Sequence, residues 1–206
     1  VNKHEPLVDC MEALYVPTTG IVDQNALMRS YIGEIEDSGS NVVFNSQFIK
    51  ATRNENIFET VIVASGEEIK IKSEVLINAS GLYAEKNAKK LDFLDNSFIP
   101  KIYFAKGNYF ETGKDLKIRH LIYPIPNEAS LGLHLGLDLG MQVRFGPDVE
   151  WVDDIDYKVN PNRLDAFYND IKKYLPHFDK SLLKPGYSGI RPKLKNKGEG
   201  KSDFLI

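Results

Sequence analysis

A strand-rich stretch between residues 101 and 145 limits this chain to folds that are built around a sheet. Gly, Pro and Asp interrupt it at the spacing of hairpins. The strands predicted within it are 102–105, 108–110, 121–123, 131–135 and 142–145. Apolar residues at helical spacing predict helices on either side, at 24–37 and 162–175. This order predicts an α+β fold, with a mixed, largely antiparallel sheet faced by helices.

The chain between these two regions contains a smaller group of predicted elements. Residues 41–45 predict a short buried strand, and 58–63 and 69–72 predict a hairpin with one exposed face. The continuous apolar run 74–79 is typical of a strand covered on both faces. A short helix is predicted at 83–90.

Composition excludes several classes of protein. The chain has 206 residues, 42% apolar and 27% charged, which is ordinary globular composition. The net charge of −3 argues against broad binding of nucleic acid, and no apolar run approaches the ~18 residues of a membrane-spanning helix. Cys10 is alone and the four histidines are far apart, so no disulfide or metal site is predicted. A reducing compartment, the cytoplasm, is the expected location.

Three local patterns are candidates for chemistry, and each has a plainer alternative. Ser80 and Gly81 close an apolar run before a helix, which suits either close approach of a ligand or a tight turn. His134 lies among leucines and suits either a general base at a sheet face or a satisfied core histidine. Arg191 precedes a proline and suits either a carboxylate-binding group or a surface arginine.

Taken in order, eight segments resemble the FAD-dependent oxidoreductases of the D-amino-acid oxidase type, with the L-2-hydroxyglutarate dehydrogenases and oxidases as the most similar branch. The segments are EP at 5–6, YVPTTGIVD at 15–23, NASGLY at 78–83, KGNYF at 106–110, YPIP at 123–126, LGLHL at 131–135, FGP at 145–147 and SGIRP at 188–192. Each is common alone, whereas the ordered set covers nearly the whole chain.

The resemblance also implies a domain organisation. Residues 1–40 are expected to form a lead-in and a helix bordering the FAD domain, and 41–91 a remnant of that domain. Residues 92–190 are expected to form the substrate-binding domain, and 191–206 a return toward the FAD domain. The chain lacks the family's N-terminal Gly-x-Gly-x-x-Gly segment and its C-terminal flavin-covering segment. It therefore looks like the middle of a longer protein.

Individual roles follow from the same resemblance. The implied cofactor contacts are Ser80 and Gly81 near the FAD diphosphate or ribose, and Lys106, Gly107 and Tyr109 beside the flavin ring. His134 would take the hydroxyl proton while the C2 hydride passes to flavin N5, and Arg191 would bind a substrate carboxylate in the same cleft. The group for a second carboxylate is left open among Tyr123, Lys106 and Arg144.

The implied function of the intact protein is FAD-dependent oxidation of an L-2-hydroxy acid such as 2-hydroxyglutarate. Two alternatives are open: an oxidase of glycine or sarcosine, and a fragment without catalysis that binds FAD weakly or not at all and is completed by a partner chain. The lysine-rich tail after 193 suits either a solvated loop or contact with a membrane and its quinones. A loop is favoured because no apolar face adjoins it, and the periphery of the inner membrane remains the alternative location.

Overall fold

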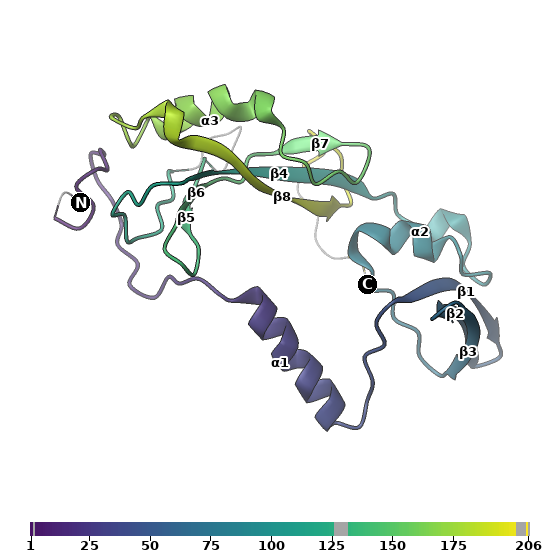
Figure 1. The fold of residues 1–206 in the computed structure, drawn as a ribbon. Coiled ribbons are helices and arrows are strands. Elements are labelled where there is room, and N and C mark those ends of the chain that lie inside the picture. The colour runs from purple at the N-terminus through teal and green to yellow at the C-terminus, as the bar shows by residue number, and fades with distance from the viewer. Residues whose placement is uncertain (2, 126–131, 201–204, 206) are drawn as a thin grey trace. The chain divides into compact units, whose positions relative to one another are not determined.

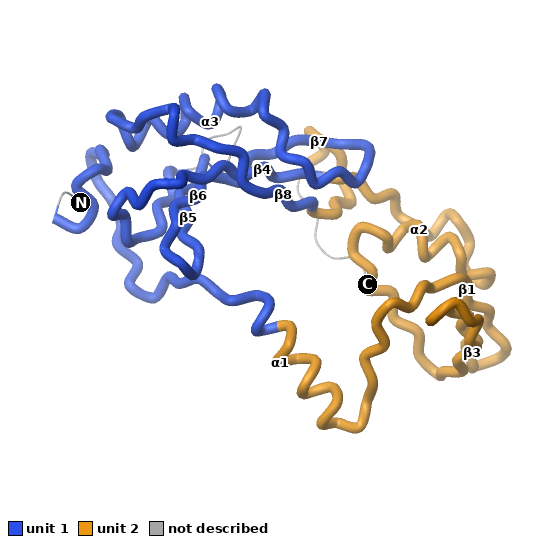
Figure 2. Tube along the Cα trace, in the orientation of Figure 1, with its two compact units in different colours: residues 1–27, 105–190 blue, residues 28–104, 191–206 orange. Residues whose placement is uncertain are grey.

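The computed structural model describes residues 1, 3–125, 132–200 and 205, and these form two compact units. The first unit consists of residues 1–27 and 105–190, and the second of 28–104 and 191–206 (Figure 2). Three antiparallel strands form one sheet, and five strands form the other. The predicted α+β class with largely antiparallel strands is confirmed.

The three-stranded sheet lies in the second unit and has the order β1-β2-β3. Its strands are β1 Ser46–Asn54, β2 Ile57–Ala64 and β3 Glu67–Ser73. Ser65 and Gly66 connect β2 to β3 with φ values of 53° and 83°, the left-handed pair that suits a two-residue hairpin turn. The predicted hairpin is thus confirmed.

Two predicted strands of this unit are absent from the described residues. At 41–45, Asn45 has a left-handed φ of 52°, so the extended chain begins only after it, at Ser46. The apolar run 74–79 forms no strand, and Val75 and Ile77 are 70% and 79% exposed. A strand needs a neighbour for its backbone groups, and no described strand pairs with this run.

The helices were largely predictable from local signals. The first helix, α1, spans Gln24–Asp37. Asp23 Oδ1 accepts a bond of 2.9 Å from the amide of Ala26, and Gly39 follows the helix with a φ of 80°. The remaining helical segments are η1 Gly81–Tyr83, α2 Ala84–Ala88, η2 Asn96–Phe98, η3 Pro161–Arg163, α3 Leu164–Ile171 and η4 Lys180–Leu182. Within the described ranges, no helix is long and apolar enough to cross a bilayer.

The five-stranded sheet carries most of the hydrophobic core. Its strands are β4 Tyr103–Thr112, β5 Leu135–Leu137, β6 Val143–Phe145, β7 Glu150–Val152 and β8 Leu183–Lys193. The order is β5-β6-β4-β7, and β8 also pairs with β4. Helix α3 runs along one face of this sheet (Figure 1), where the ring of Phe167 lies 4.6 Å from that of Phe110. This face is the buried side of the first unit.

The strands of this sheet differ in detail from the prediction. The segments 102–105 and 108–110 form one strand, because β4 continues through Gly107. The predicted strand 121–123 is reduced to one bridge, in which Ile122 pairs with Leu135. Residue 131 lies outside the described residues, and β5 begins only at Leu135. Strands β7 and β8 were not predicted.

Candidate functional site

The five-stranded sheet has a second face, opposite α3, whose side chains differ from those of the core. Side chains alternate through β5 and the two residues before it: Leu133, Leu135 and Leu137 lie in the core, and His134 and Gly136 face the opposite side. On the neighbouring strand, Val143 and Phe145 are buried and Arg144 is half-buried between them. We call this side the polar face and define it by His134, Gly136, Arg144, Tyr109 and Tyr187.

The imidazole of His134 is half-buried on the polar face and does not belong to the hydrophobic core. Its ring meets the ring of Tyr123 edge-on, with 4.5 Å between centroids and 77° between planes. Ile122, next to Tyr123, exchanges two backbone hydrogen bonds of 2.9 Å with Leu135. Two paired segments therefore determine where these two rings meet.

A glycine separates His134 from the tyrosines of the polar face. Gly146 donates its amide to the carbonyl of His134 at 2.9 Å. A Cβ at Gly146 would come within 2.9 Å of the Tyr109 ring, so this ring lies where a larger side chain would project. The Tyr109 ring stacks in turn on Tyr187, with 4.4 Å between centroids and 8° between planes. The result is a flat aromatic surface beside a residue without a side chain.

Arg144 is the cation of the polar face. Its Nη2 donates to Asp138 Oδ2 at 2.9 Å, and its guanidinium carbon lies 5.2 Å from the centre of the Tyr187 ring. Burial lowers the pKa of Arg144, but Asp138 and Tyr187 outweigh it and raise that pKa above its ordinary value. The pKa of Asp138 is lowered, mainly because the backbone amide of Gln142 donates to its carboxylate. Burial of Asp138 raises this pKa in part, and Arg144 lowers it further. This pair therefore stays ionised at neutral pH.

Two of the β4 residues predicted to contact FAD make close contacts within the first unit. Lys106 is buried, and its ammonium group lies 4.0 Å from Asp156 Oδ2. It alternates with Gly107 and Tyr109, so it projects from the opposite side of the strand. A Cβ at Gly107 would lie 2.7 Å from Pro147 Cβ, so close packing already accounts for this glycine. Cofactor contacts of Lys106, Gly107 and Tyr109 stay predictions.

A buried polar cluster on the α3 side of β4 escaped the sequence reasoning. Asn108 is fully buried and donates from its side chain to Asp148 Oδ1 at 3.1 Å and Glu150 Oε2 at 2.9 Å. The backbone amide of Asn160 donates to Asn108 Oδ1, and its side-chain amide donates to Glu150 Oε1. Arg163 Nε lies 2.6 Å from Asp148 Oδ2. Only the odd placement of a polar residue inside an apolar strand could have indicated it.

Ser80 and Gly81 belong to the second unit and begin η1. The Ser80 hydroxyl lies 2.6 Å from Asn78 Oδ1 and accepts a bond of 3.0 Å from Asn87 Nδ2. Gly81 has a φ of 56°, and a Cβ there would meet no atom within 4 Å. Ser80 also lines a surface pocket together with Phe48 and Asn87. The geometry explains a tight turn, and a role in binding FAD stays a prediction.

Arg191 and Tyr123 complete the predicted set. Arg191 is exposed, lies near the end of β8 and is counted with the second unit, whereas His134 belongs to the first. The expectation that Arg191 and His134 share a cleft therefore stays a prediction. Tyr123 is brought to His134, as described above. Among the described residues, no group of acidic, His and Cys side chains could hold a metal ion.

Comparisons with known proteins agree with this fold. The chain is 34% identical to the mitochondrial L-2-hydroxyglutarate dehydrogenase of Arabidopsis thaliana, over 99% of this chain and 50% of that protein. It is 30% identical to an L-2-hydroxyglutarate dehydrogenase of Indibacter alkaliphilus, over 71% of this chain and 36% of that protein. The chain thus spans half or less of the length of these relatives.

Solved structures show the same fold at lower identity. The L-alpha-glycerophosphate oxidase of Mycoplasma pneumoniae superposes with a TM-score of 0.75 and 14% identity, over 96% of this chain and 52% of that one. Glycine oxidase from Bacillus cereus superposes with a TM-score of 0.68 and 14% identity, over 93% of this chain and 50% of that one. The family model described as FAD dependent oxidoreductase (DAO) matches residues 1–206. The chain therefore belongs to the DAO family of FAD-dependent oxidoreductases.

Proposed function

We propose that the full-length protein oxidises an L-2-hydroxy acid, with 2-hydroxyglutarate as the substrate, to the corresponding 2-oxo acid. Two relatives named L-2-hydroxyglutarate dehydrogenase, at 34% and 30% identity, support the choice of substrate. Membership of the DAO family supports FAD as the cofactor.

The observation that carries this proposal is the placement of His134 on the polar face, with its ring against Tyr123 and next to Gly146. Removal of a hydroxyl proton needs a base that substrate can reach, and a half-buried imidazole at a sheet face meets this need better than a core histidine. A neutral imidazole has one nitrogen free of hydrogen and can therefore accept the proton.

The polar face also suits a flat cofactor. A Cβ at Gly136 would have only the Arg144 carbonyl oxygen within 4.0 Å, so the sheet leaves room above this glycine. Tyr109 and Tyr187 present an aromatic surface nearby. On the resemblance, Gly107 and Tyr109 would border the flavin ring, with Ser80 and Gly81 near the diphosphate or ribose. FAD, when bound, supplies the acceptor for the hydride that leaves the substrate.

The chain's own residues would divide the remaining work. His134 would take the proton from the substrate hydroxyl, and Tyr123 would orient the substrate through its phenol group. Arg191 would bind the carboxylate next to the reacting carbon, because a guanidinium binds carboxylates with two parallel hydrogen bonds. Orientation by these groups would lower the entropic part of the barrier.

The experiment that tests the proposal is a His134→Ala substitution in the full-length protein loaded with FAD. We expect kcat for L-2-hydroxyglutarate to fall by about 10²–10⁴-fold, the usual effect of losing a general base. The visible flavin spectrum should be unchanged, because the substitution leaves the aromatic surface in place. His177→Ala is the matched control, since His177 is exposed on a different segment, and it should keep the parent kcat.

Two results would contradict the proposal. One is a His134→Ala protein with the kcat of the parent. The other is turnover of glycine or sarcosine, but not of 2-hydroxyglutarate, by the parent protein. The amine substrate reacts from its neutral form and does not need a base for a hydroxyl proton, so this result would favour the amino-acid oxidase.

A further inference from the structure

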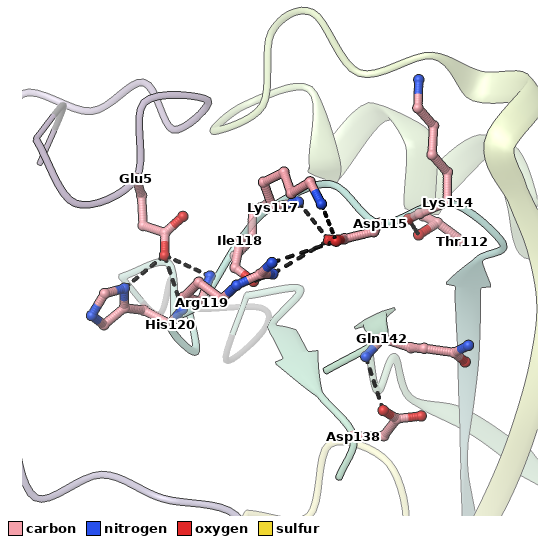
Figure 3. Close-up of polar contacts among 10 residues, drawn as sticks. All are labelled: Glu5, Thr112, Lys114, Asp115, Lys117, Ile118, Arg119, His120, Asp138 and Gln142. Carbon is pink, nitrogen blue, oxygen red and sulfur yellow. Dashed lines mark hydrogen bonds and ion pairs between the residues drawn. The ribbon is translucent and has the colours of Figure 1, made fainter. Parts of the chain in front are cut away.

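Glu5 is a buried carboxylate that the proposed chemistry does not use. It lies in the N-terminal segment and is 5% exposed. Its Oε1 accepts from the backbone amides of Arg119 and His120 at 2.8 and 2.9 Å, and His120 Nδ1 lies 2.6 Å from the same oxygen (Figure 3). Its Oε2 is buried as well, with no hydrogen-bond partner among the described residues. Burial of a carboxylate is costly, so a specific reason for its placement is expected.

The Glu5 carboxylate is itself firmly positioned. Val8 belongs to the hydrophobic core, and its amide donates to the carbonyl of Glu5 at 3.1 Å. The next residue, Asp9, donates its amide to the carbonyl of Tyr174 at 2.9 Å. The backbone that carries Glu5 is therefore tied to the core on its C-terminal side.

The segment that Glu5 binds leads directly to the His134 site. Ile118 is buried in the core, and the two amides bound by Glu5 follow it. Ile122, two residues after His120, pairs with Leu135, and the ring of Tyr123 meets that of His134 at 4.5 Å. Only this short connection separates the Glu5 contact from the ring that packs on the proposed base.

We propose that Glu5 is a positioning residue for the proposed reaction: by binding the 119–120 backbone, its carboxylate fixes Tyr123 against His134. This inference rests on the proposed role of His134 as a base. Glu5 touches neither substrate nor cofactor in this role. An error of about 1 Å in the placement of a reacting group can lower the rate about a hundredfold. Accurate placement of the base is therefore a sufficient reason for the buried carboxylate of Glu5.

The His120 ring adds a second contact to the same carboxylate. It also meets two further rings edge-on, that of Tyr15 with centroids at 5.8 Å and that of His4 at 5.9 Å. These rings pack the N-terminal segment on the 119–120 backbone from the side. Replacement of His120 by Gln therefore removes a ring contact, whereas the two amide bonds to Glu5 remain.

The test is a double-mutant cycle in the full-length, FAD-loaded protein. Glu5→Ala is expected to lower kcat for L-2-hydroxyglutarate by about 10- to 100-fold, and to raise KM by no more than the roughly fivefold expected for loss of the Tyr123 hydroxyl. In the His134→Ala background the same change should lower kcat by less than about twofold, because a residue that acts through His134 has nothing left to position. Glu12→Gln, an exposed carboxylate of the same segment, is the control and should leave kcat unchanged.

A spectroscopic measurement extends the test beyond activity. In protein labelled with ¹³C at the histidine Cε1 positions, Glu5→Ala should move the NMR signal of His134 and leave that of the exposed His177 in place. Glu5→Gln keeps an accepting oxygen for the two amides, so it should leave the His134 signal near that of the parent. If Glu5→Ala does not fold, Glu5→Asp, whose shorter side chain draws the carboxylate away from the two amides, replaces it. Glu12→Gln should move neither signal.

The outcomes separate this inference from the proposed function. Equal losses of kcat from Glu5→Ala in both backgrounds, or an unmoved His134 signal in Glu5→Ala (or in Glu5→Asp where that variant replaces it), would overturn the positioning role and leave the function standing. If His134→Ala itself keeps the parent kcat, the proposed function fails first. A loss confined to the His134-containing background, together with a moved signal, supports the inference.

Discussion

The ring of Tyr109 lies over Gly146, the residue that follows β6, at the place where any other residue would carry its side chain. The backbone at Gly146 has a φ of 133°, which residues with a Cβ rarely adopt. Both the conformation and the space therefore require glycine at this position. The contact links the strand that carries Tyr109 to the carbonyl of His134, which accepts the Gly146 amide.

Gly146→Ala should destabilise the protein and distort the polar face. The new Cβ would lie 2.6 Å from the Asn108 carbonyl oxygen as well as 2.9 Å from the Tyr109 ring. We expect a loss of about 2–4 kcal/mol in the free energy of unfolding, from the backbone strain and the clash. Urea denaturation measures it, with Gly136→Ala as the control. At Gly136 the nearest atom is 4.0 Å away, so a change above about 1 kcal/mol there would contradict the explanation.

Asn108→Ala should be strongly destabilising for a different reason. It removes the side-chain donor to Asp148 and Glu150 and the acceptor of the Asn160 backbone amide. Asp148 keeps its bonds from the Asn108 backbone amide and Arg163, whereas Glu150 Oε2 and the Asn160 amide, both half-buried, lose the partner that Asn108 gave them. A cost of about 2 kcal/mol or more is expected, since each of these two unsatisfied groups costs about 1–3 kcal/mol. Thermal or urea denaturation would show it. Asn162→Ala, at an exposed position, should change stability by less than about 0.5 kcal/mol.

Local signals were sufficient for the elements that depend on neighbouring residues. Helix α1 was predicted at its observed bounds because Asp23 and Gly39 mark its ends in the sequence itself. The 74–79 run was predicted wrongly, because strand formation depends on a partner that no local pattern supplies. Strand β8 was missed for the opposite reason. Its two prolines and two glycines indicate a loop, whereas pairing with β4 makes it a strand.

The candidate site also combines features that the local sequence indicates with contacts that only the fold creates. The leucines around His134 left two readings open, a base at a sheet face and a satisfied core histidine, and the folded chain places the ring half-buried outside the core. The Tyr123 contact and the Glu5 contact join residues that are 11 and 115 positions apart, and only the folded chain brings them together. The Asn108 cluster depends in the same way on contacts across 40 or more positions.

Glu150 should make stability dependent on pH in the acidic range. Burial raises the pKa of its carboxyl group, but hydrogen bonds from Asn108 and Asn160, with the nearby charges of Lys106 and Arg163, outweigh burial and lower it. The folded protein thus binds this proton more weakly than the unfolded chain. The contribution is complete above the unfolded pKa of about 4.3 and is lost as the pH falls through the lower folded value.

Glu150→Gln tests this dependence. Its free energy of unfolding should fall less steeply than that of the parent between about pH 4.5 and pH 3, because the titrating group is gone. At pH 7 the variant should be less stable by about 1–3 kcal/mol, since its amide NH₂ faces the donors that bound the carboxylate. Urea denaturation at several pH values measures both effects. An acid slope identical to that of the parent would show that Glu150 does not contribute.

Two substitutions at Tyr123 should separate the roles proposed for its hydroxyl and its ring. Tyr123→Phe keeps the ring that meets His134 at 4.5 Å and removes only the hydroxyl. We expect KM for L-2-hydroxyglutarate to rise by about fivefold, the value of one hydrogen bond of about 1 kcal/mol, with kcat within about twofold of the parent. Tyr123→Ala removes the ring as well, so His134 loses its neighbour and kcat should fall by about tenfold or more. Tyr157→Phe serves as the control at an exposed tyrosine, and steady-state kinetics of the three variants give the comparison. Equal kcat values for Tyr123→Phe and Tyr123→Ala would show that the ring does not position the proposed base.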